Sequence, residues 1–209
     1  MSDVDARPGT EGGLRVPTWS TQLDPGGPIV ELRAVDPVAD LDLVHQWMVQ
    51  PHVSPWWALD GPADEVGRYL DAQCRATHLT PWIVSVDGEP VAYTETYDVA
   101  GDPLADHHAF ADGDRGWHVL VGDPAHLGTG VTRAVGRAVV GGLLRRRGTN
   151  AVVCEPDIRN ERMIRFCARL GHEQVAELRL PDKVAALLVC RREDFALRWP
   201  DDLRGEPIP

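Results

Sequence analysis

The sequence predicts an α/β or α+β domain with a mixed sheet, and three observations lead to that prediction. The chain has 209 residues, which suits one domain at roughly 150 residues per domain. Hydrophobic residues make up 43% of it and charged residues 25%, as is ordinary for a soluble globular enzyme. Segments with strand and helix periodicity alternate in the order strand, two helices, hairpin, strand, helix, strand, helix, hairpin.

The first ordered elements follow a segment rich in Gly and Pro. Residues 1–28 have neither helical nor strand periodicity, and we expect them to form a loosely ordered arm. Alternating apolar and polar residues over 29–35 predict a half-buried strand. Apolar residues at helical spacing over 36–48 predict a helix that Pro51 ends, and residues 65–76 predict a second helix.

The middle of the chain carries a hairpin signal. Two strand-like runs, 82–86 and 90–97, flank Asp87-Gly88, a dipeptide typical of two-residue hairpin turns. Residues 98–115 are acidic and contain Pro and Gly, so they predict a surface loop. A short strand is expected at 117–121.

The second half predicts a helix, a strand, a helix and a hairpin. An apolar stripe over 128–147 indicates a helix that Gly148 ends. Residues 151–155 indicate a buried strand, and Asn160 is a good N-cap for a helix through Leu170. Two strand-like runs within 173–190 indicate the second hairpin.

The predicted domain spans residues 29–199, with a C-terminal tail at 200–209.

The charge balance narrows the class of protein. Lys and Arg total 21 against 32 Asp and Glu, a formal net charge of −11. This argues against partners that are nucleic acids or anionic membranes, and suits a cationic small molecule. No apolar run approaches the roughly 18 residues of a membrane span, no signal peptide is evident, and four scattered cysteines suggest reduced thiols. We therefore expect a cytoplasmic protein.

A Gly-rich loop joins the strand at 117–121 to the helix that follows it. Gly128 and Gly130 let the backbone approach a ligand closely, and the free N–H groups at the helix start favour a pyrophosphate. The alternative is an ordinary Gly-rich turn before a helix. Nearby side chains that add hydroxyl donors or positive charge are Thr129, Thr132, Arg133, Arg137 and 145–147.

The stretch from Ala125 to Gly130 resembles the Gln/Arg-x-x-Gly-x-Gly/Ala motif of the GNAT superfamily of acyl-CoA N-acyltransferases, with Ala125 in place of Gln or Arg. A strand at 152–155 and the helix opened by Asn160 follow, as in that family. The resemblance implies the GNAT fold, a mixed, mostly antiparallel sheet flanked by helices, with acetyl-CoA or another acyl-CoA as co-substrate. The cofactor-binding residues that it implies are Leu120, Val121, His126, Leu127, Gly128, Thr129, Gly130, Val131, Thr132, Arg133, Asn160 and Met163.

Several stretches make the chain similar to the siderophore-biosynthesis branch of that superfamily: 47–48, 93–97, 116–122, 155–163, and 180–187 followed by 190–195. The branch includes aerobactin-type hydroxylysine acetyltransferases and mycobactin lysine acyltransferases. The resemblance covers roughly residues 30–198. It implies acylation of the terminal amine or hydroxylamine of hydroxylysine, hydroxyornithine or an N-hydroxydiamine, by direct transfer in a ternary complex. The expected partner is this small-molecule acceptor, and the enzyme is expected to be a monomer or homodimer.

The resemblance points to His118 and Asp157 as active-site residues. Acyl transfer to nitrogen needs a neutral nucleophile and the disposal of one proton. A hydroxylamine is largely neutral near pH 7, so the demand on a base is modest. His118, with an unperturbed pKa of about 6.5, suits that base, and Asp157 orients it or accepts a hydrogen bond from the hydroxylamine. A backbone N–H near Leu120 or Val121 polarises the acyl carbonyl. The alternatives are a core histidine and a turn-forming aspartate.

Substrate contacts are expected from aromatic and acidic residues. Alternation places Tyr93, Glu95 and Tyr97 on one face of a strand, where Glu95 holds a substrate ammonium or faces solvent. Trp56 and Trp57 line the acceptor pocket or pack the loop between two helices.

Several residues are expected to take no part in the chemistry. Lys183 belongs to a hairpin turn, and Cys154 and Cys167 have no evident base beside them, so no covalent intermediate is expected. The histidines lack metal-ligand spacing, which predicts no metal site.

Arginines of the helix at 128–147 are expected to give the CoA phosphates a positive surrounding.

Two other functions stay open on the sequence alone. The chain shares Pro51-His52, Trp56-Trp57 and the turn before Pro90 with aminoglycoside 6′-N-acetyltransferases, which confer antibiotic resistance. A non-catalytic acyl-CoA-binding domain on the same fold is the other alternative.

Overall fold

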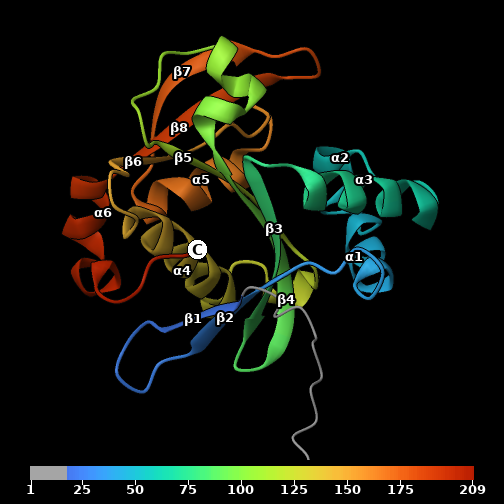
Figure 1. Cartoon of the computed structure of the whole chain (residues 1–209), viewed down its shortest axis with the longest axis horizontal. Helices are drawn as coiled ribbons and strands as arrows, with labels where there is room; N and C mark the ends of the chain where they lie inside the picture. The colour runs from blue at the N-terminus through green and yellow to red at the C-terminus, as the bar shows by residue number, and fades with distance from the viewer. Residues whose placement is uncertain (1–17) are drawn as a thin grey trace, which may run out of the picture.

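The computed structural model describes residues 18–209, which form one eight-stranded sheet with helices on both faces (Figure 1). The strands are β1 (Thr18–Gln22), β2 (Ile29–Ala34), β3 (Leu79–Val86), β4 (Glu89–Asp98), β5 (Arg115–Val121), β6 (Ala151–Cys154), β7 (Glu173–Arg179) and β8 (Val184–Arg191). The helices are α1 (Leu41–Met48), α2 (Ser54–Trp57), α3 (Ala63–Arg75), α4 (Gly130–Leu144), α5 (Glu161–Leu170) and α6 (Arg192–Arg198). Short 3₁₀ turns cover Val99–Gly101, Pro103–Asp106, Pro124–His126 and Pro200–Leu203.

The strand order is β1-β2-β3-β4-β5-β6-β8-β7, and the pairing is antiparallel throughout except between β5 and β6. The parallel ladder between β5 and β6 contains only two pairs, Arg115 with Val152 and Gly116 with Val153. The predicted fold class, a mixed and mostly antiparallel sheet flanked by helices, is confirmed. Because β5 and β6 part after Gly116, the rest of β5 is free of a neighbour on that side among the described residues.

The two predicted hairpins form where turn chemistry allows them. Asp87 and Gly88 both adopt positive φ, 51° and 84°, as a tight turn between β3 and β4 requires. The β7–β8 hairpin closes with the Leu180 N–H donating to the Lys183 carbonyl at 2.9 Å. Both hairpin predictions are confirmed, and the predicted helices form within a few residues of their expected bounds.

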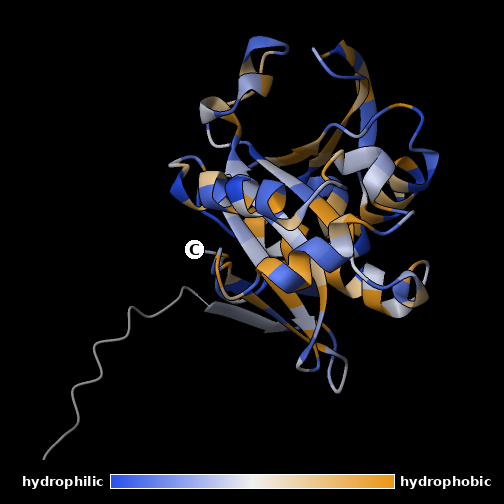
Figure 2. Cartoon of the chain, turned by 90° about the vertical axis from the view of Figure 1, so that its right-hand side faces the viewer, coloured by the Kyte–Doolittle hydropathy of each residue, from blue (hydrophilic) through white to orange (hydrophobic). Residues whose placement is uncertain are grey.

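The helices divide between the two faces of the sheet (Figure 1). On one face α4 and α5 bury their apolar residues against strand residues such as Trp82 and Trp117. On the other face α1 and α3 pack Trp47 and Leu70 against Ile83 and Leu120. Figure 2 views the side that carries α1, α2 and α3, and along α1 and α3 it shows hydrophilic and hydrophobic residues interspersed. This pattern is what a helix with one buried face requires.

The predicted N-terminal arm needs correction where it can be compared. Residues 1–17 lie outside the described residues, but Thr18–Gln22 form β1, which pairs with β2. The reason is the side chain of Trp19, which is buried and whose indole N–H donates to the Glu206 carbonyl at 3.1 Å.

The predicted C-terminal tail is also wrong, because residues 200–209 pack into the domain. Asp202 and Ile208 are both buried, and the C-terminus ends beside α4 in Figure 1. Gly142 on α4 makes room for Ile208, since a Cβ at this glycine would overlap the Ile208 side chain. The Ile208 N–H donates to the Gly142 carbonyl at 3.1 Å. Among residues 18–209, no helix is long and apolar enough to cross a membrane.

Candidate active site

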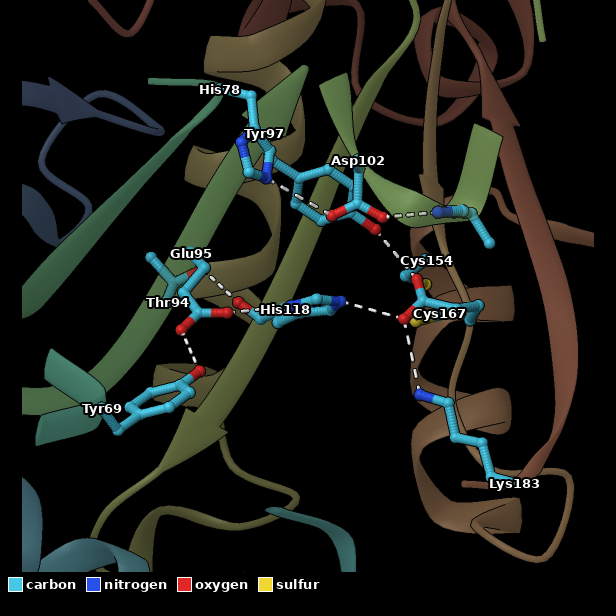
Figure 3. A network of polar contacts seen from close by, with 12 residues as sticks. Tyr69, His78, Thr94, Glu95, Tyr97, Asp102, His118, Cys154, Cys167 and Lys183 are labelled. Atoms are coloured by element: carbon cyan, nitrogen blue, oxygen red, sulfur yellow. Dashed lines mark hydrogen bonds and ion pairs between the residues drawn. The ribbon is translucent and has the colours of Figure 1, made fainter. Parts of the chain in front are cut away.

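A polar cluster lies on the three central strands, on the face that also carries α1 and α3. Glu95 on β4 and His118 on β5 are direct cross-strand neighbours, and Glu155 directly follows β6. His118 Nδ1 lies 2.9 Å from Glu95 Oε2, and His118 Nε2 lies 2.9 Å from Glu155 Oε1. Figure 3 shows the imidazole ring in the centre of this network. The pairing therefore places one imidazole between two carboxylates.

Glu95 is held by two tyrosines besides His118. Its Oε1 accepts a hydrogen bond from Tyr93 at 2.7 Å and another from Tyr69 on α3. The Glu95 side chain is only 3% exposed, so these three donors replace its hydration. The prediction that Tyr93, Glu95 and Tyr97 share one face is confirmed. Glu95 is nevertheless occupied from all sides, and the expected ammonium contact is not open in this structure.

Glu155 is held by Tyr97 and Lys183 as well as by His118. Tyr97 donates to Glu155 Oε2 at 2.9 Å, and the Lys183 ammonium lies 3.4 Å from Glu155 Oε1. Tyr97 starts on β4 and reaches Glu155 by crossing β5 at Gly116, where a Cβ would overlap its ring. Gly116 is therefore the residue that lets a β4 side chain reach the end of β6.

The two carboxylates keep His118 protonated. Burial on its own lowers the pKa of His118, but the charges and hydrogen bonds of Glu155 and Glu95 outweigh it and raise this pKa to about 10. Burial likewise opposes ionisation of Glu155, yet His118 and its other donors bring the pKa of Glu155 down to about 2. The pKa of Glu95 is also lowered, because its three donors outweigh burial. At neutral pH the cluster holds an imidazolium between two carboxylates, so His118 is not the neutral base with an ordinary pKa that the sequence suggested.

Asp157 stands apart from this cluster. Its carboxylate accepts from the Arg159 guanidinium at 2.9 and 2.6 Å and from the Arg159 backbone N–H at 2.8 Å. These contacts lower the pKa of Asp157 to about 2. Both ring nitrogens of His118 already face Glu95 and Glu155, so Asp157 does not orient His118 here. It borders the site through the backbone, where it pairs with Ala185 of β8.

The two adjacent tryptophans have different surroundings. The Trp57 ring packs edge-on against the rings of Tyr93, 5.5 Å away, and His118, 6.3 Å away. Trp56 is 41% exposed. Trp57 thus covers the cluster, whereas Trp56 is open to solvent.

The loop between β5 and α4 has the geometry of an anion cradle. Gly128 adopts a positive φ of 75°, and Cβ atoms built on Gly128 and Gly130 would meet no atom within 4 Å. Thr129 caps α4 by accepting from the Val131 N–H at 3.2 Å. A ligand could therefore approach this backbone closely at the start of a fifteen-residue helix. The residues present fit the diphosphate of an acyl-CoA.

Several side chains predicted to assist that cradle are used otherwise. Thr129 and Thr132 donate their hydroxyl hydrogens to the His126 carbonyl, at 2.7 and 2.6 Å. Arg133 is exposed, but Arg137 is buried against Asp24 and Asp202. Of the further predicted cofactor-binding residues, Leu120 and Val121 are buried and the others are half-buried: His126, Leu127, Val131, Asn160 and Met163. The expectation that Arg137 meets the CoA phosphates is wrong, because its guanidinium already binds two carboxylates.

The free side of β5 presents a backbone N–H. Gly122 donates to the Val91 carbonyl at 2.9 Å, and the ladder between β4 and β5 has no bulge. N–H groups along an antiparallel strand alternate in direction. The backbone N–H of Leu120 therefore points towards β4, and that of Val121 points away from β4. His52 Nε2 lies 2.8 Å from the Val121 carbonyl, in keeping with that direction. Of the two expected residues, only Val121 has its N–H on the free side.

The helix cap at Asn160 forms as expected, and the thiols are enclosed. Asn160 Oδ1 accepts from the Met163 N–H at 3.1 Å. The sulfurs of Cys154 and Cys167 lie 3.5 Å apart in the core, and burial raises the pKa of Cys154 well above its usual value. Within residues 18–209, no group of three or more His, Cys, Asp and Glu residues could hold a metal ion.

Three members of the cluster escaped the sequence reasoning: Tyr69, Glu155 and Lys183. Glu155 carried a usable signal, since it is a carboxylate directly after a buried strand beside the strand of His118. Tyr69 sits on a surface helix far along the chain from Glu95, and nothing local ties the two together.

The comparisons with known proteins identify the family of this chain. Residues 36–180 match the model of the acetyltransferase (GNAT) domain, and the chain belongs to the GNAT family of acetyltransferases. It is 35% identical to the N-hydroxyputrescine acetyltransferase of Acinetobacter baumannii over 78% of each chain. It is 30% identical to an N(6)-hydroxylysine O-acetyltransferase of Escherichia coli over 80% of this chain and 53% of that protein.

Among solved structures, the chain is similar to an aminoglycoside acetyltransferase, AAC(6′)-Ib, in complex with paromomycin and acetyl-CoA. The TM-score is 0.71 at 27% identity, over 79% of this chain and 95% of that one. The fold and the family are therefore established together, and they make this chain an acyltransferase related to enzymes of siderophore biosynthesis.

Proposed function

We propose that this enzyme transfers an acyl group from acyl-CoA to the terminal hydroxylamine of a hydroxylated amine, forming a hydroxamate for a siderophore. The acceptor is of the N-hydroxydiamine, hydroxylysine or hydroxyornithine class. The relatives named for N-hydroxyputrescine and N(6)-hydroxylysine support this class. The reaction runs in the cytoplasm, where acyl-CoA is available.

The observation that carries the choice of a hydroxylamine is the saturation of the central cluster. His118 donates from both ring nitrogens, while Glu95 and Glu155 each accept from three donors. His118, with a proton on each ring nitrogen, has no lone pair for a substrate proton, and the donors around Glu95 and Glu155 lower the pKa of both carboxylates and make them weak bases. An alkylamine with a pKa of about 10.4 is protonated at pH 7 and needs a base before it can attack. A hydroxylamine is already neutral and does not.

The proposed reaction is a direct transfer. The hydroxylamine nitrogen attacks the thioester carbon, the carbon–sulfur bond breaks, and the proton lost by nitrogen ends on the CoA thiolate. The Val121 N–H faces the free side of β5 and polarises the thioester carbonyl. The loop around Gly128 and Gly130 binds the diphosphate, and Asn160 lies at the adjacent helix start. His118 contributes a fixed positive charge near the reacting atoms.

The acceptor would lie beside Trp57, whose ring borders His118 and Tyr93. Asp157, at the rim of the site, is proposed to accept a hydrogen bond from the hydroxylamine, since its carboxylate is ionised and its other partner, Arg159, is a surface residue. Trp56, exposed in this structure, is proposed to contact the distal part of the acceptor.

The proposal is tested by comparing acceptors in one assay. Purified enzyme with acetyl-CoA is given N-hydroxycadaverine, cadaverine or kanamycin, and released thiol and Fe(III)-binding hydroxamate are both measured. At pH 7 we expect kcat/KM for N-hydroxycadaverine to exceed that for cadaverine by at least about tenfold. A higher kcat/KM for kanamycin would instead favour the aminoglycoside activity of the structural neighbour. Binding of acetyl-CoA without turnover of any acceptor would favour a non-catalytic domain.

A further inference from the structure

The exposed side of the central cluster is cationic, although the chain as a whole is acidic. The His118 and Lys183 side chains are 32% and 24% exposed. The Glu95 and Glu155 side chains are 3% and 8% exposed. The four charges sum to zero, but the carboxylates lie inside and the cations lie towards solvent. A molecule that enters the site therefore meets the imidazolium and the ammonium first.

Lys183 is the only lysine in the sequence, where every other basic side chain apart from histidine is arginine. It lies at the turn between β7 and β8, and its backbone carbonyl closes that turn. The turn itself requires no ammonium at this position. Figure 3 shows the Lys183 side chain extending from its ribbon towards the carboxylate beside His118. The hairpin thus places one primary ammonium at the rim of the active site.

The bonding of this ammonium is incomplete. The ammonium has three N–H donors. Its contact is with Glu155 Oε1, 3.4 Å away, and this oxygen already accepts a hydrogen bond from His118 at 2.9 Å. No hydrogen bond joins Lys183 to the neighbouring Asp157, whose carboxylate pairs with Arg159 in this structure. Donor capacity is left over for an anionic group of a substrate.

We propose that Lys183 is a specificity-determining residue that binds a carboxylate carried by one of the two substrates. The proposal rests on the proposed function, since it concerns the same site. The carboxylate has two possible sources with the same chemistry: the α-carboxylate of an amino-acid acceptor, or the free carboxylate of a dicarboxylic acyl group on CoA. A charge-assisted hydrogen bond from a half-buried ammonium recognises either of them.

A grid of four substrate pairs separates the two sources. Acetyl-CoA and succinyl-CoA are each combined with N6-hydroxylysine and with N-hydroxycadaverine, which lacks the α-carboxylate. Wild-type enzyme is compared with Lys183→Met, which keeps the length of the side chain, and with Lys183→Arg, which keeps the charge. The matched control is Arg179→Met, because Arg179 is an exposed cation on the same hairpin.

We expect Lys183→Met to raise KM about tenfold or more for every pair that contains the recognised carboxylate, with kcat changed less than KM. The pairs without that carboxylate should stay within about twofold of wild type, and Lys183→Arg should recover part of the loss. If Lys183→Met lowers kcat equally for all four pairs, Lys183 only positions Glu155 and the proposal is overturned. Equal wild-type KM with and without each carboxylate overturns it as well.

A binding measurement keeps this test separate from the proposed reaction. Since Lys183 is the only lysine, protein labelled with isotopic lysine gives one side-chain NMR signal. That signal should shift on addition of either N6-hydroxylysine or succinyl-CoA, and not with the matching compound that lacks the carboxylate. A shift without turnover would support the carboxylate site while the proposed function fails. Turnover of N-hydroxycadaverine without any carboxylate-specific shift would retain the function and overturn this proposal.

Discussion

At the scale of single residues, the environment of His118 decides what the site can do. A histidine on a central strand next to a Gly-rich loop suggests a neutral base, and that expectation uses its ordinary pKa. Glu95 opposite it and Glu155, directly after the neighbouring strand β6, reverse the expectation, because both ring N–H groups then donate to carboxylates 2.9 Å away. The residue was found from the sequence, but its charge depends on one partner from β4 and another that follows β6.

The charged state of His118 can be measured. Because its folded-state pKa of about 10 lies above the unfolded value of about 6.5, its stabilising effect is fully present below pH 6.5 and is lost as pH rises through 10. We expect the His118 ring signals in NMR, assigned with a His118→Gln variant, not to titrate between pH 5 and 8. Glu155→Gln should lower this pKa, whereas Glu161→Gln on the exposed side of α5 should leave it unchanged. A wild-type midpoint near 6.5 would contradict the paired imidazolium.

At the scale of elements, β5 connects the two halves of the site through a glycine. Tyr97 of β4 and Glu155 after β6 meet only because Gly116 between them has no side chain. We expect Gly116→Ala to destabilise the fold by about 1–3 kcal/mol, since its Cβ would overlap the Tyr97 ring. The activity should fall as well, because Tyr97 loses its hydrogen bond to Glu155. Urea unfolding and steady-state kinetics measure both effects.

Two variants control this test. Gly67→Ala on α3 adds a Cβ in ordinary contact with Leu41 at 3.6 Å, and it should leave stability unchanged or raise it by up to about 1 kcal/mol. Tyr97→Phe removes only the hydroxyl, and because the lost hydrogen bond goes to a charged carboxylate it should cost about 1.5–3 kcal/mol. If Gly116→Ala is as stable as wild type, the Tyr97 ring does not pack closely against the backbone of Gly116.

The elements that the sequence predicted well are those with local causes. The turn at Asp87-Gly88 and the helix cap at Asn160 depend on neighbours within a few residues, and both form as expected. The cluster around His118 depends on α3 and on the β7–β8 turn, which reach it only through the tertiary fold. Local periodicity contains no information on which helix faces which strand, so Tyr69 and Lys183 could not be assigned in advance.

At the scale of the whole molecule, Arg137 joins three distant parts of the chain. Its guanidinium on α4 binds Asp202 at 2.8 Å and Asp24 at 2.9 Å, and it lies 4.3 Å from the centre of the Trp199 ring. The sequence suggested a basic helix ready for phosphates, a loosely ordered N-terminal arm, and a C-terminal tail outside the domain. In the structure, Arg137 instead binds Asp24 near the N-terminus and Asp202 near the C-terminus. It thereby holds both segments to α4, the helix whose N-terminus forms the proposed CoA cradle.

Removing this arginine should therefore affect the whole domain. In Arg137→Met, the Asp202 side chain, only 1% exposed, would keep its charge without a partner, and we expect a loss of about 3–5 kcal/mol in the free energy of unfolding. Arg204→Met is the matched control, because Arg204 pairs with Asp201 at the surface with 81% of its side chain exposed, and it should change stability by less than about 0.5 kcal/mol. Urea unfolding followed by tryptophan fluorescence measures both, since Trp19 and Trp199 lie in the affected region.

Deletion of residues 200–209 should destabilise at least as much as Arg137→Met, because it also removes the buried Ile208. If the deletion variant keeps wild-type stability, residues 200–209 do not belong to the folded core.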